Sequence, residues 1–139
     1  MFSIRYLTIE DKEFWFSLDK RATEQEFLKR VRDRQGYILF EQEKPVGIMH
    51  FTVLWDNLPF LNLLYIKKDY RGKGGGKFAM HFWEKDMQKF GYKMVLLSTR
   101  SDEGAQHFYR KIGYQDCGCL VLKEPPFQQP MELFFSKTL

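Results

Sequence analysis

An abrupt change of residue pattern in the middle of the chain places the tightest limit on its fold. Residues 60–66, FLNLLYI, form an almost wholly apolar run that is typical of a strand buried on both faces. Residues 69–77, DYRGKGGGK, then place four glycines and three cations in nine positions. Residues 78–90 follow with apolar side chains at helical spacing. A buried strand, a bare cationic loop and an amphipathic helix in succession predict a mixed α/β fold.

The rest of the chain alternates between helical and strand-like segments around this unit. Strands are expected at residues 2–7, 36–42, 46–55, 93–99, 117–122 and 131–136. Helices are expected at residues 11–19, 23–35, 78–90 and 102–112. The turn-like residues 43–45 make the second and third strands an antiparallel hairpin. With 139 residues and no repeat or linker, we expect one mixed α/β domain, residues 1–139, in which about four helices flank a mixed sheet of six to seven strands.

Helical spacing also predicts which side chains of two helices face the core. In the second helix, Thr23 and Glu26 have the spacing of a capping box. The residues of that helix expected to point inward are Phe27, Leu28 and Val31. In the third helix, the expected buried face consists of Phe78, Phe82, Trp83, Met87 and Phe90, and the expected solvent face of Glu84, Lys85, Gln88 and Lys89. Gly36 and Gly91 are expected to end these two helices.

Composition argues against several classes of protein and site. No apolar run approaches the roughly 18 residues of a membrane span, so we expect no membrane partner and a cytoplasmic location. Cys117 and Cys119 are too close in sequence to join distant parts of a fold, which suits a reducing compartment. His50, His81 and His107 are scattered at spacings that match no zinc site, so we expect no metal.

The glycine-rich loop has the features of an anion-binding site. Amide groups at the start of a helix have no carbonyl acceptor within it, and the helix dipole adds positive potential. Glycine leaves no Cβ between a phosphate and those amides, and it permits the left-handed backbone that turns them inward. Arg71, Lys73 and Lys77 add positive charge. A tight bend alone needs one or two glycines, so we expect this loop to bind a phosphate or pyrophosphate.

The spacing of the loop separates known phosphate-binding patterns. A Walker A loop is excluded because the glycine spacing is one residue short and Phe78 replaces the Mg²⁺-binding hydroxyl. The dinucleotide fingerprint fails because Lys77 takes the place of its third glycine. The pattern [RQ]-x-x-G-x-[GA] fits, with Arg71, Gly74 and Gly76. Together with the downstream stretch DEGAQHFYRKIGY, this makes residues 61–114 resemble the GNAT superfamily of acyl-CoA-dependent N-acetyltransferases.

The resemblance implies a binding site for acetyl-CoA as co-substrate, with no metal. In that family the sheet splays between its two central parallel strands, here LLYI and KMVLLST, and the pantetheine arm lies in the gap. The implied cofactor-binding residues are Leu64, Tyr65, Ile66, Arg71, Gly72, Lys73, Gly74, Gly75, Gly76, Lys77, Ala105 and Phe108. Tyr109 is the implied general acid, which protonates the departing CoA thiolate. Asp102 stands where family members often have asparagine, and we expect it to cap the following helix.

The implied reaction is transfer of an acetyl group from acetyl-CoA to a primary amine of a small molecule or peptide, by direct attack in a ternary complex. The general base stays unassigned, with Asp56, Glu41 and His50 as open candidates. Three aromatic side chains could line the acceptor pocket, although aromatic residues at these spacings more often belong to the core: Trp15, Phe51 and Trp55. Whether the chain forms a homodimer is also open.

Two functions of other classes remain as alternatives at this stage. A non-catalytic acyl-CoA sensor would keep the loop, but the presence of Tyr109 argues against it. A nucleic-acid-binding module is suggested by the sequence pI of about 9.0 and the stretch YRGKGGGKF. That stretch lacks the order of aromatic residues of an RNA-binding motif, so we expect no nucleic-acid partner.

Overall fold

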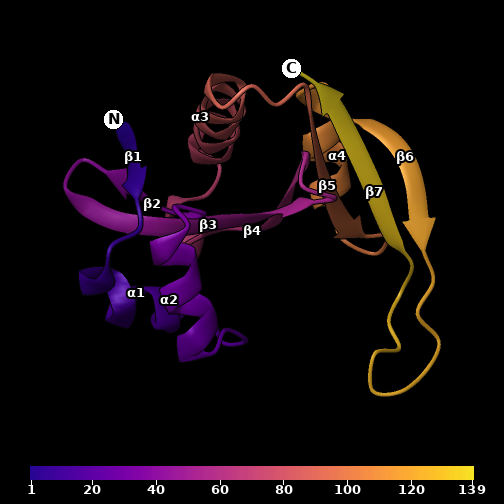
Figure 1. The fold of residues 1–139 in the computed structure, drawn as a ribbon, viewed down its shortest axis with the longest axis horizontal. Helices are drawn as coiled ribbons and strands as arrows, with labels where there is room; N and C mark the ends of the chain where they lie inside the picture. The colour runs from indigo at the N-terminus through magenta and orange to yellow at the C-terminus, as the bar shows by residue number, and fades with distance from the viewer. The chain divides into compact units, whose positions relative to one another are not determined.

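The computed structural model describes residues 1–139 as seven strands and four α-helices, with two short 3-10 turns. The strands are β1 Phe2–Tyr6, β2 Gly36–Glu41, β3 Lys44–Leu54, β4 Leu58–Ile66, β5 Met94–Arg100, β6 Gln115–Leu120 and β7 Glu132–Thr138. The helices are α1 Lys12–Leu18, α2 Glu24–Arg32, α3 Gly75–Lys89 and α4 Ala105–Lys111 (Figure 1). None of these helices has the length and apolar character needed to cross a membrane.

The strands form one mixed sheet in the order β1-β2-β3-β4-β5-β7-β6. Strands β4 and β5 are parallel, with Phe60 opposite Leu96, whereas β1/β2, β2/β3, β5/β7 and β6/β7 are antiparallel. The predicted fold class is therefore confirmed, and so is the hairpin formed by β2 and β3. The parallel pair contains the two segments that the resemblance assigned to the centre of the sheet.

Contacts between residues divide the chain into two compact units. The first unit consists of Met1–Thr52 and Asn62–Asp86, and the second consists of Val53–Leu61 and Met87–Leu139. The first unit contains β1, β2, α1 and α2, together with most of β3 and α3 and the second half of β4. The second unit contains β5, α4, β6 and β7.

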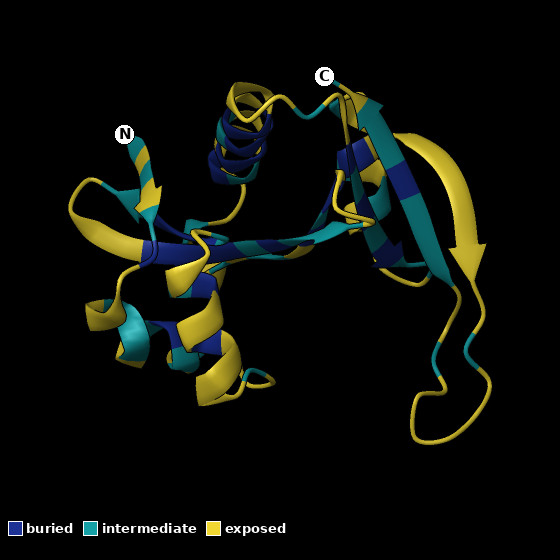
Figure 2. Cartoon of the chain, in the orientation of Figure 1, coloured by how far each residue is buried: buried dark blue, intermediate teal, exposed yellow.

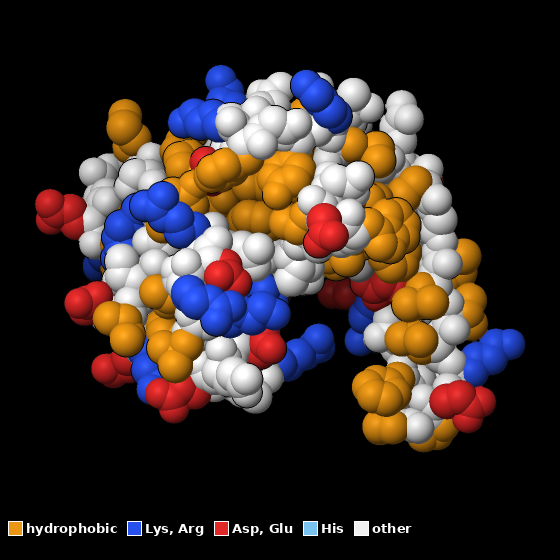
Figure 3. Space-filling model, in the orientation of Figure 1, with side chains coloured by type: hydrophobic (Ala, Val, Ile, Leu, Met, Phe, Trp, Pro, Cys, Tyr) orange, Lys and Arg blue, Asp and Glu red, His pale blue; other side chains and the backbone are white.

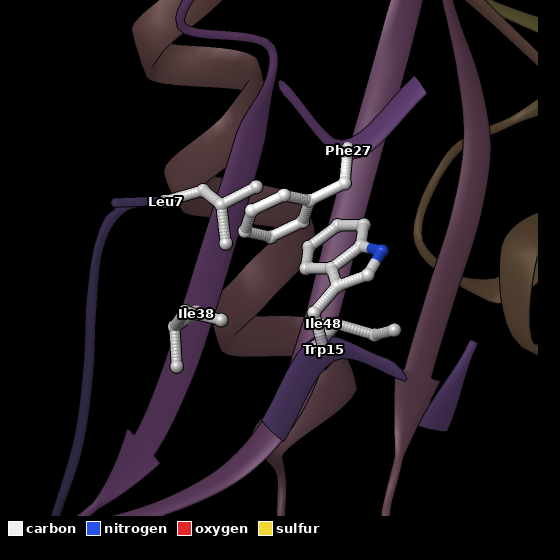
Figure 4. Close-up of a cluster of buried hydrophobic side chains, with 5 residues drawn as sticks. All are labelled: Leu7, Trp15, Phe27, Ile38 and Ile48. Carbon is white, nitrogen blue, oxygen red and sulfur yellow. The ribbon is translucent and has the colours of Figure 1, made fainter. Parts of the chain in front are cut away.

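In the first unit, α3 lies on one face of the strands, and α1 and α2 lie on the other (Figure 1). The core under α1 and α2 is a cluster of side chains that are all at most 4% exposed: Leu7, Trp15, Phe27, Ile38 and Ile48. Figure 4 shows the indole nitrogen of Trp15 pointing away from the other four. Burying each such side chain contributes about 1.5–3 kcal/mol, so this cluster is a main source of stability for the unit.

The predicted start of α2 is confirmed, whereas its end and one face differ from prediction. The hydroxyl of Thr23 accepts a hydrogen bond from the amide of Glu26 at 3.2 Å. Leu28 is 42% exposed, because the buried stripe runs through Phe27 and Arg30, one position away. The helix ends at Arg32, before the predicted Gly36.

Gly36 has a packing role instead of a capping role. It is the first residue of β2, where a Cβ would lie only 2.9 Å from a methyl carbon of Leu7. The turn after α2 is made by Arg34, whose φ of 56° is left-handed. The sequence could not indicate this turn, because arginine has no preference for that backbone conformation.

The buried face of α3 is rotated slightly from the predicted one. Trp83 and Met87 are fully buried as expected, and Figure 2 shows buried residues along much of the helix. Phe78 and Phe90 are 38% and 59% exposed, and Glu84 is only 8% exposed. These three predictions were wrong. Ala79 and Met80 take the inward positions of the first turn in place of Phe78. Glu84 lies among the buried positions of the later turns, and Phe90 lies beyond the last helical residue, Lys89. Lys85, Gln88 and Lys89 are exposed as predicted, and Gly91, with a φ of 88°, ends the helix as predicted.

The prediction that β4 is covered on both faces holds only for its first half. Leu58 and Leu61 are 8% and 4% exposed, in the part of the strand that belongs to the second unit. Asn62 is exposed and Tyr65 is 38% exposed, in the part that belongs to the first unit.

In the second unit, β7 pairs with β5 on one side and with β6 on the other. All six residues of β6 are exposed, and they include the free cysteines Cys117 and Cys119 (Figure 2). The loop between β6 and β7 also carries hydrophobic side chains on its surface, with Phe127 69% exposed (Figure 3). The core of this unit contains the buried side chains Val95, Leu97, Tyr109, Tyr114 and Phe135.

Candidate functional site

The loop between β4 and α3 uses its glycines for two different purposes. Gly72 and Gly74 have φ values of 75° and 90°, and a Cβ at either would meet no atom within 4 Å. Glycine is favoured at these two positions by the backbone conformation, and the space around them stays open. At Gly75 the reason is packing, because a Cβ would lie 3.1 Å from the ring of Phe2. Gly75 therefore allows α3 to approach β1 closely.

The first turn of α3 has amide groups that are not used by the helix. The amide of Phe78 donates to the carbonyl of Gly74 at 3.0 Å, as the first bond of the helical ladder. The amides of Gly75, Gly76 and Lys77 precede it, so they have no acceptor within the helix. Gly74 is exposed at their edge. These donors and the helix dipole together form a position that favours a phosphate oxygen.

The three cations of the loop are not equivalent. The Nε of Arg71 donates to the carbonyl of Ile66 at 2.7 Å, and its guanidinium lies 5.1 Å from the centre of the Tyr65 ring. Arg71 is thus held against β4 by both contacts. The ammonium of Lys73 lies 5.5 Å from the centre of the Tyr70 ring, and Lys77 is exposed.

The predicted residues of β4 lie in the same unit as the loop and are linked to it by Arg71. The carbonyl of Ile66 is already an acceptor for Arg71. On the opposite side, β3 comes so close that a Cβ at Gly47 would lie 2.9 Å from the carbonyl oxygen of Tyr65. The structure therefore brings together Leu64, Tyr65 and Ile66 with the loop from Arg71 to Lys77.

Tyr109 lies on α4 in the second unit, together with Ala105 and Phe108. Its side chain is buried, with 8% exposure, and its ring contacts those of Phe108 and Tyr114 at centroid distances of 5.1 and 5.8 Å. Burial raises the pKa of the Tyr109 phenol to about 12. The phenol therefore keeps its proton at neutral pH, as a proton or hydrogen-bond donor must.

Comparison with protein families gives a match over most of the chain. The model of the Acetyltransferase (GNAT) family matches residues 3–114. The chain belongs to the GNAT family. Its enzyme class is accordingly that of the acyl-CoA-dependent N-acetyltransferases.

Solved structures show the same GNAT fold at low sequence identity. The ribosomal-protein-S18-alanine N-acetyltransferase from Escherichia coli matches with a TM-score of 0.82 and 17% identity, over 99% of this chain and 94% of that one. Naa50 of Arabidopsis thaliana, in complex with the bisubstrate analogue CoA-Ac-MVNAL, gives 0.83 and 13%, over 99% of both chains. A Bacillus subtilis acetyltransferase in complex with CoA gives 0.79 and 14%, over 100% and 99%. No curated protein matches the sequence.

Asp102 departs from the capping role expected for this position of the GNAT motif. Helix α4 begins at Ala105, with Gly104 as its N-cap residue. The carboxylate of Asp102 is instead held by the guanidinium of Arg100, with N–O distances of 3.1 and 2.9 Å. The prediction was wrong because an arginine two residues earlier in the chain captures this carboxylate.

The three candidates for the general base differ in environment. Glu41 accepts a hydrogen bond from the N-terminal ammonium at 2.9 Å, and Asp56 lies exposed in a turn with a φ of 64°. Burial and the neighbouring Arg30 lower the pKa of His50 to about 4. Such an imidazole is a weak base toward an ammonium of pKa about 10.4. We assign the base to none of the three, and no group of side chains that could hold a metal ion is present.

The aromatic side chains considered for an acceptor pocket also differ in how far they are buried. Trp15 and Phe51 are core residues, with 1% and 4% exposure, whereas Trp55 is 82% exposed at the turn between β3 and β4. Sequence reasoning also missed buried polar residues of this GNAT fold, among them Asp86 of α3, which is 8% exposed. The available signal was an acidic residue three positions after the inward-facing Trp83.

Proposed function

We propose that this GNAT chain transfers the acetyl group of acetyl-CoA to a primary amine of a small molecule or peptide, by direct attack of the amine in a ternary complex. The observation that carries the proposal is the start of α3. There the amides of Gly75, Gly76 and Lys77 follow two left-handed glycines and an open surface. Donors in this arrangement suit the pyrophosphate of CoA.

The residues of the first unit fit the cofactor in both backbone and charge. The pyrophosphate would be held by the segment from Arg71 to Lys77, and the pantetheine arm by the main chain of Leu64, Tyr65 and Ile66. Contact at the Ile66 carbonyl would compete with the hydrogen bond from Arg71. Ala105 and Phe108 are included as cofactor contacts on the resemblance of their motif to that of the family.

Tyr109 is proposed as the group that stabilises the leaving thiolate. Full proton transfer from a phenol of pKa about 12 to a thiolate whose thiol has a pKa of about 8.5 is uphill by about 5 kcal/mol. A hydrogen bond to the departing sulfur carries no such penalty. We therefore assign Tyr109 to hydrogen-bond donation to the sulfur as the C–S bond breaks and negative charge develops there, while the phenol keeps its proton and CoA leaves as the thiolate.

The proposal also covers the organisation of the chain and its surroundings. We propose a single GNAT domain, which is supported by a family match that runs through both units. The inclusion of peptide amines is supported by the names of two structural neighbours, an S18-alanine N-acetyltransferase and a complex with a CoA-Ac-MVNAL analogue. Two free, exposed cysteines support a reducing compartment such as the cytoplasm.

Calorimetry with acetyl-CoA, CoA and the diphosphate-free thioester S-acetylpantetheine tests the proposal. We expect acetyl-CoA and CoA to bind and S-acetylpantetheine to bind much more weakly, because only the first two carry the diphosphate. An amine panel of spermidine, lysine and peptides with free N-termini is then scored by mass spectrometry for acetylated product. Folded protein that gives no binding heat with CoA contradicts the proposal. Binding without acetylated product would favour the non-catalytic sensor.

A further inference from the structure

Asp86 is a buried carboxylate that joins α3 to two strands of the first unit. Its Oδ2 accepts hydrogen bonds from the phenol of Tyr6 in β1 at 2.7 Å and from the phenol of Tyr37 in β2 at 2.6 Å. The two tyrosines are direct partners in the β1/β2 register, and their rings stack at 5.3 Å. Burial and Asp86 raise the pKa of Tyr6 to about 12 and raise that of Tyr37 as well. Both phenols therefore remain donors at neutral pH.

The same helix meets β1 again at its other end. A Cβ at Gly75 would lie 3.1 Å from the ring of Phe2, and the rings of Phe2 and Phe78 are 6.1 Å apart. Gly75 and Asp86 are separated by eleven residues, which is about 16 Å along a helix. Helix α3 is thus fixed to β1 near both ends of this span, at Phe2 and at Tyr6.

The two contacts differ in how strictly they fix the helix. Between them lie aromatic contacts such as Tyr37 with Phe82, at 5.9 Å, which fill space without specifying one orientation. Two hydrogen bonds to one carboxylate oxygen specify both the rotation of the helix and its position along its axis. A buried carboxylate is costly, and an apolar residue of similar size is often at least as good for stability. The arrangement therefore favours a role in geometry over a role in stability.

We propose that Asp86 is a positioning residue for the cofactor loop. By binding Tyr6 and Tyr37, it sets the position of α3 and thereby of the amides of Gly75, Gly76 and Lys77 that begin the helix. This inference rests on the proposed function, since it assumes that those amides bind the diphosphate of acetyl-CoA. Asp86 acts on the cofactor only through the helix.

The test compares two variants that differ in stability. Asp86→Ala leaves both phenols without their acceptor, so it should destabilise the fold. The triple variant Tyr6→Phe, Tyr37→Phe, Asp86→Leu replaces the whole group by apolar side chains and should melt near the wild-type temperature. Ile48→Ala is the matched control, because it weakens the core on the opposite face of the same unit. Each protein is assayed with acetyl-CoA and with S-acetylpantetheine, well below its melting temperature.

We expect both Asp86 variants to raise the KM for acetyl-CoA about tenfold with kcat nearly unchanged. Their kcat/KM with S-acetylpantetheine should equal that of the wild type, because this thioester has no diphosphate for the loop to hold. A wild-type KM for acetyl-CoA in the folded triple variant would overturn the inference, and so would an equal loss with both thioesters. If the wild-type protein binds no CoA at all, the proposed function itself fails. If the wild type binds CoA and the folded triple variant has the same KM for acetyl-CoA, only the inference about Asp86 fails.

Discussion

The chain contains two connections that lead from a strand of the parallel pair into a helix, and their chemistry is opposite. Between β4 and α3, four of the five residues 72–76 are glycine, and three amides of the first helical turn have no acceptor within the helix. Between β5 and α4, the carboxylate of Asp102 is bound by Arg100. There the side-chain amide of Gln106 also donates to the carbonyls of Ser101 and Glu103, at 2.9 and 3.0 Å.

The difference shows that a strand-to-helix connection is not by itself enough for an anion site, because the residues of the connection must also suit an anion. The β5–α4 connection already carries two carboxylates, Asp102 and Glu103, and an anion there would meet negative charge. Its helix has seven residues, against fifteen in α3, so the potential at its start is also weaker. In the β4–α3 connection, the glycines leave the backbone amides accessible to a ligand, and the lysines supply positive charge. We therefore assign binding to the first connection and leaving-group chemistry to the helix after the second.

Tyr109→Phe gives the largest expected effect and tests this division of roles. Losing the phenol should lower kcat by about 100-fold or more and leave the calorimetric affinity for CoA unchanged. Because the pKa of Tyr109 is raised to about 12, the phenol stays protonated up to about pH 10. We therefore expect a pH–rate profile to show no loss of kcat from Tyr109 ionisation at any pH below about 10. Tyr114→Phe, at a buried neighbouring tyrosine, is the control. A wild-type turnover number in Tyr109→Phe would contradict the proposed role of Tyr109 toward the leaving thiolate.

Exchange of glycine for alanine compares the two connections directly. Gly74→Ala places a Cβ on a residue with a φ of 90°, whereas Gly104→Ala places one at −74°, where alanine is unstrained. A left-handed alanine costs about 1–2 kcal/mol, so the loop of Gly74→Ala should relax to an unstrained backbone in the free protein. Because CoA binding must then restore the left-handed conformation, we expect the Kd for CoA to rise about tenfold in Gly74→Ala alone. Calorimetry on both variants makes the measurement. An equal change in the two would mean that backbone conformation is not what distinguishes the connections.

Removing single lysines should give the smallest effect. Lys73→Ala is expected to weaken CoA binding about threefold at low salt, because an exposed cation contributes up to about 1 kcal/mol. The difference should disappear near 1 M salt, where screening is nearly complete. Lys111→Ala, in the last turn of α4, is the matched control and should bind as the wild type. A salt-independent loss would point to packing of Lys73 on Tyr70.

Features set by neighbouring residues could be predicted from the sequence, whereas features set by distant ones could not. The strand, loop and helix from Leu58 to Lys89 follow local periodicity and glycine placement, so they were visible in the pattern. The prediction that Asp102 caps α4 was wrong because Arg100 competes for the carboxylate. The contacts of Asp86 join residues 80 and 49 positions away, so no window of the sequence contains them. The exposure of Leu28 reflects a rotation of one position, which helical spacing alone does not resolve.

The exposed strand β6 has a practical consequence for measuring this enzyme. Its two free thiols, Cys117 and Cys119, are accessible to reagents that report free sulfhydryls. Detection of liberated coenzyme by such a reagent would begin with a background signal of two equivalents per polypeptide. Exchanging both cysteines for serine would remove that background. The same pair, confined to one strand, would otherwise serve as an attachment point for a fluorescent label.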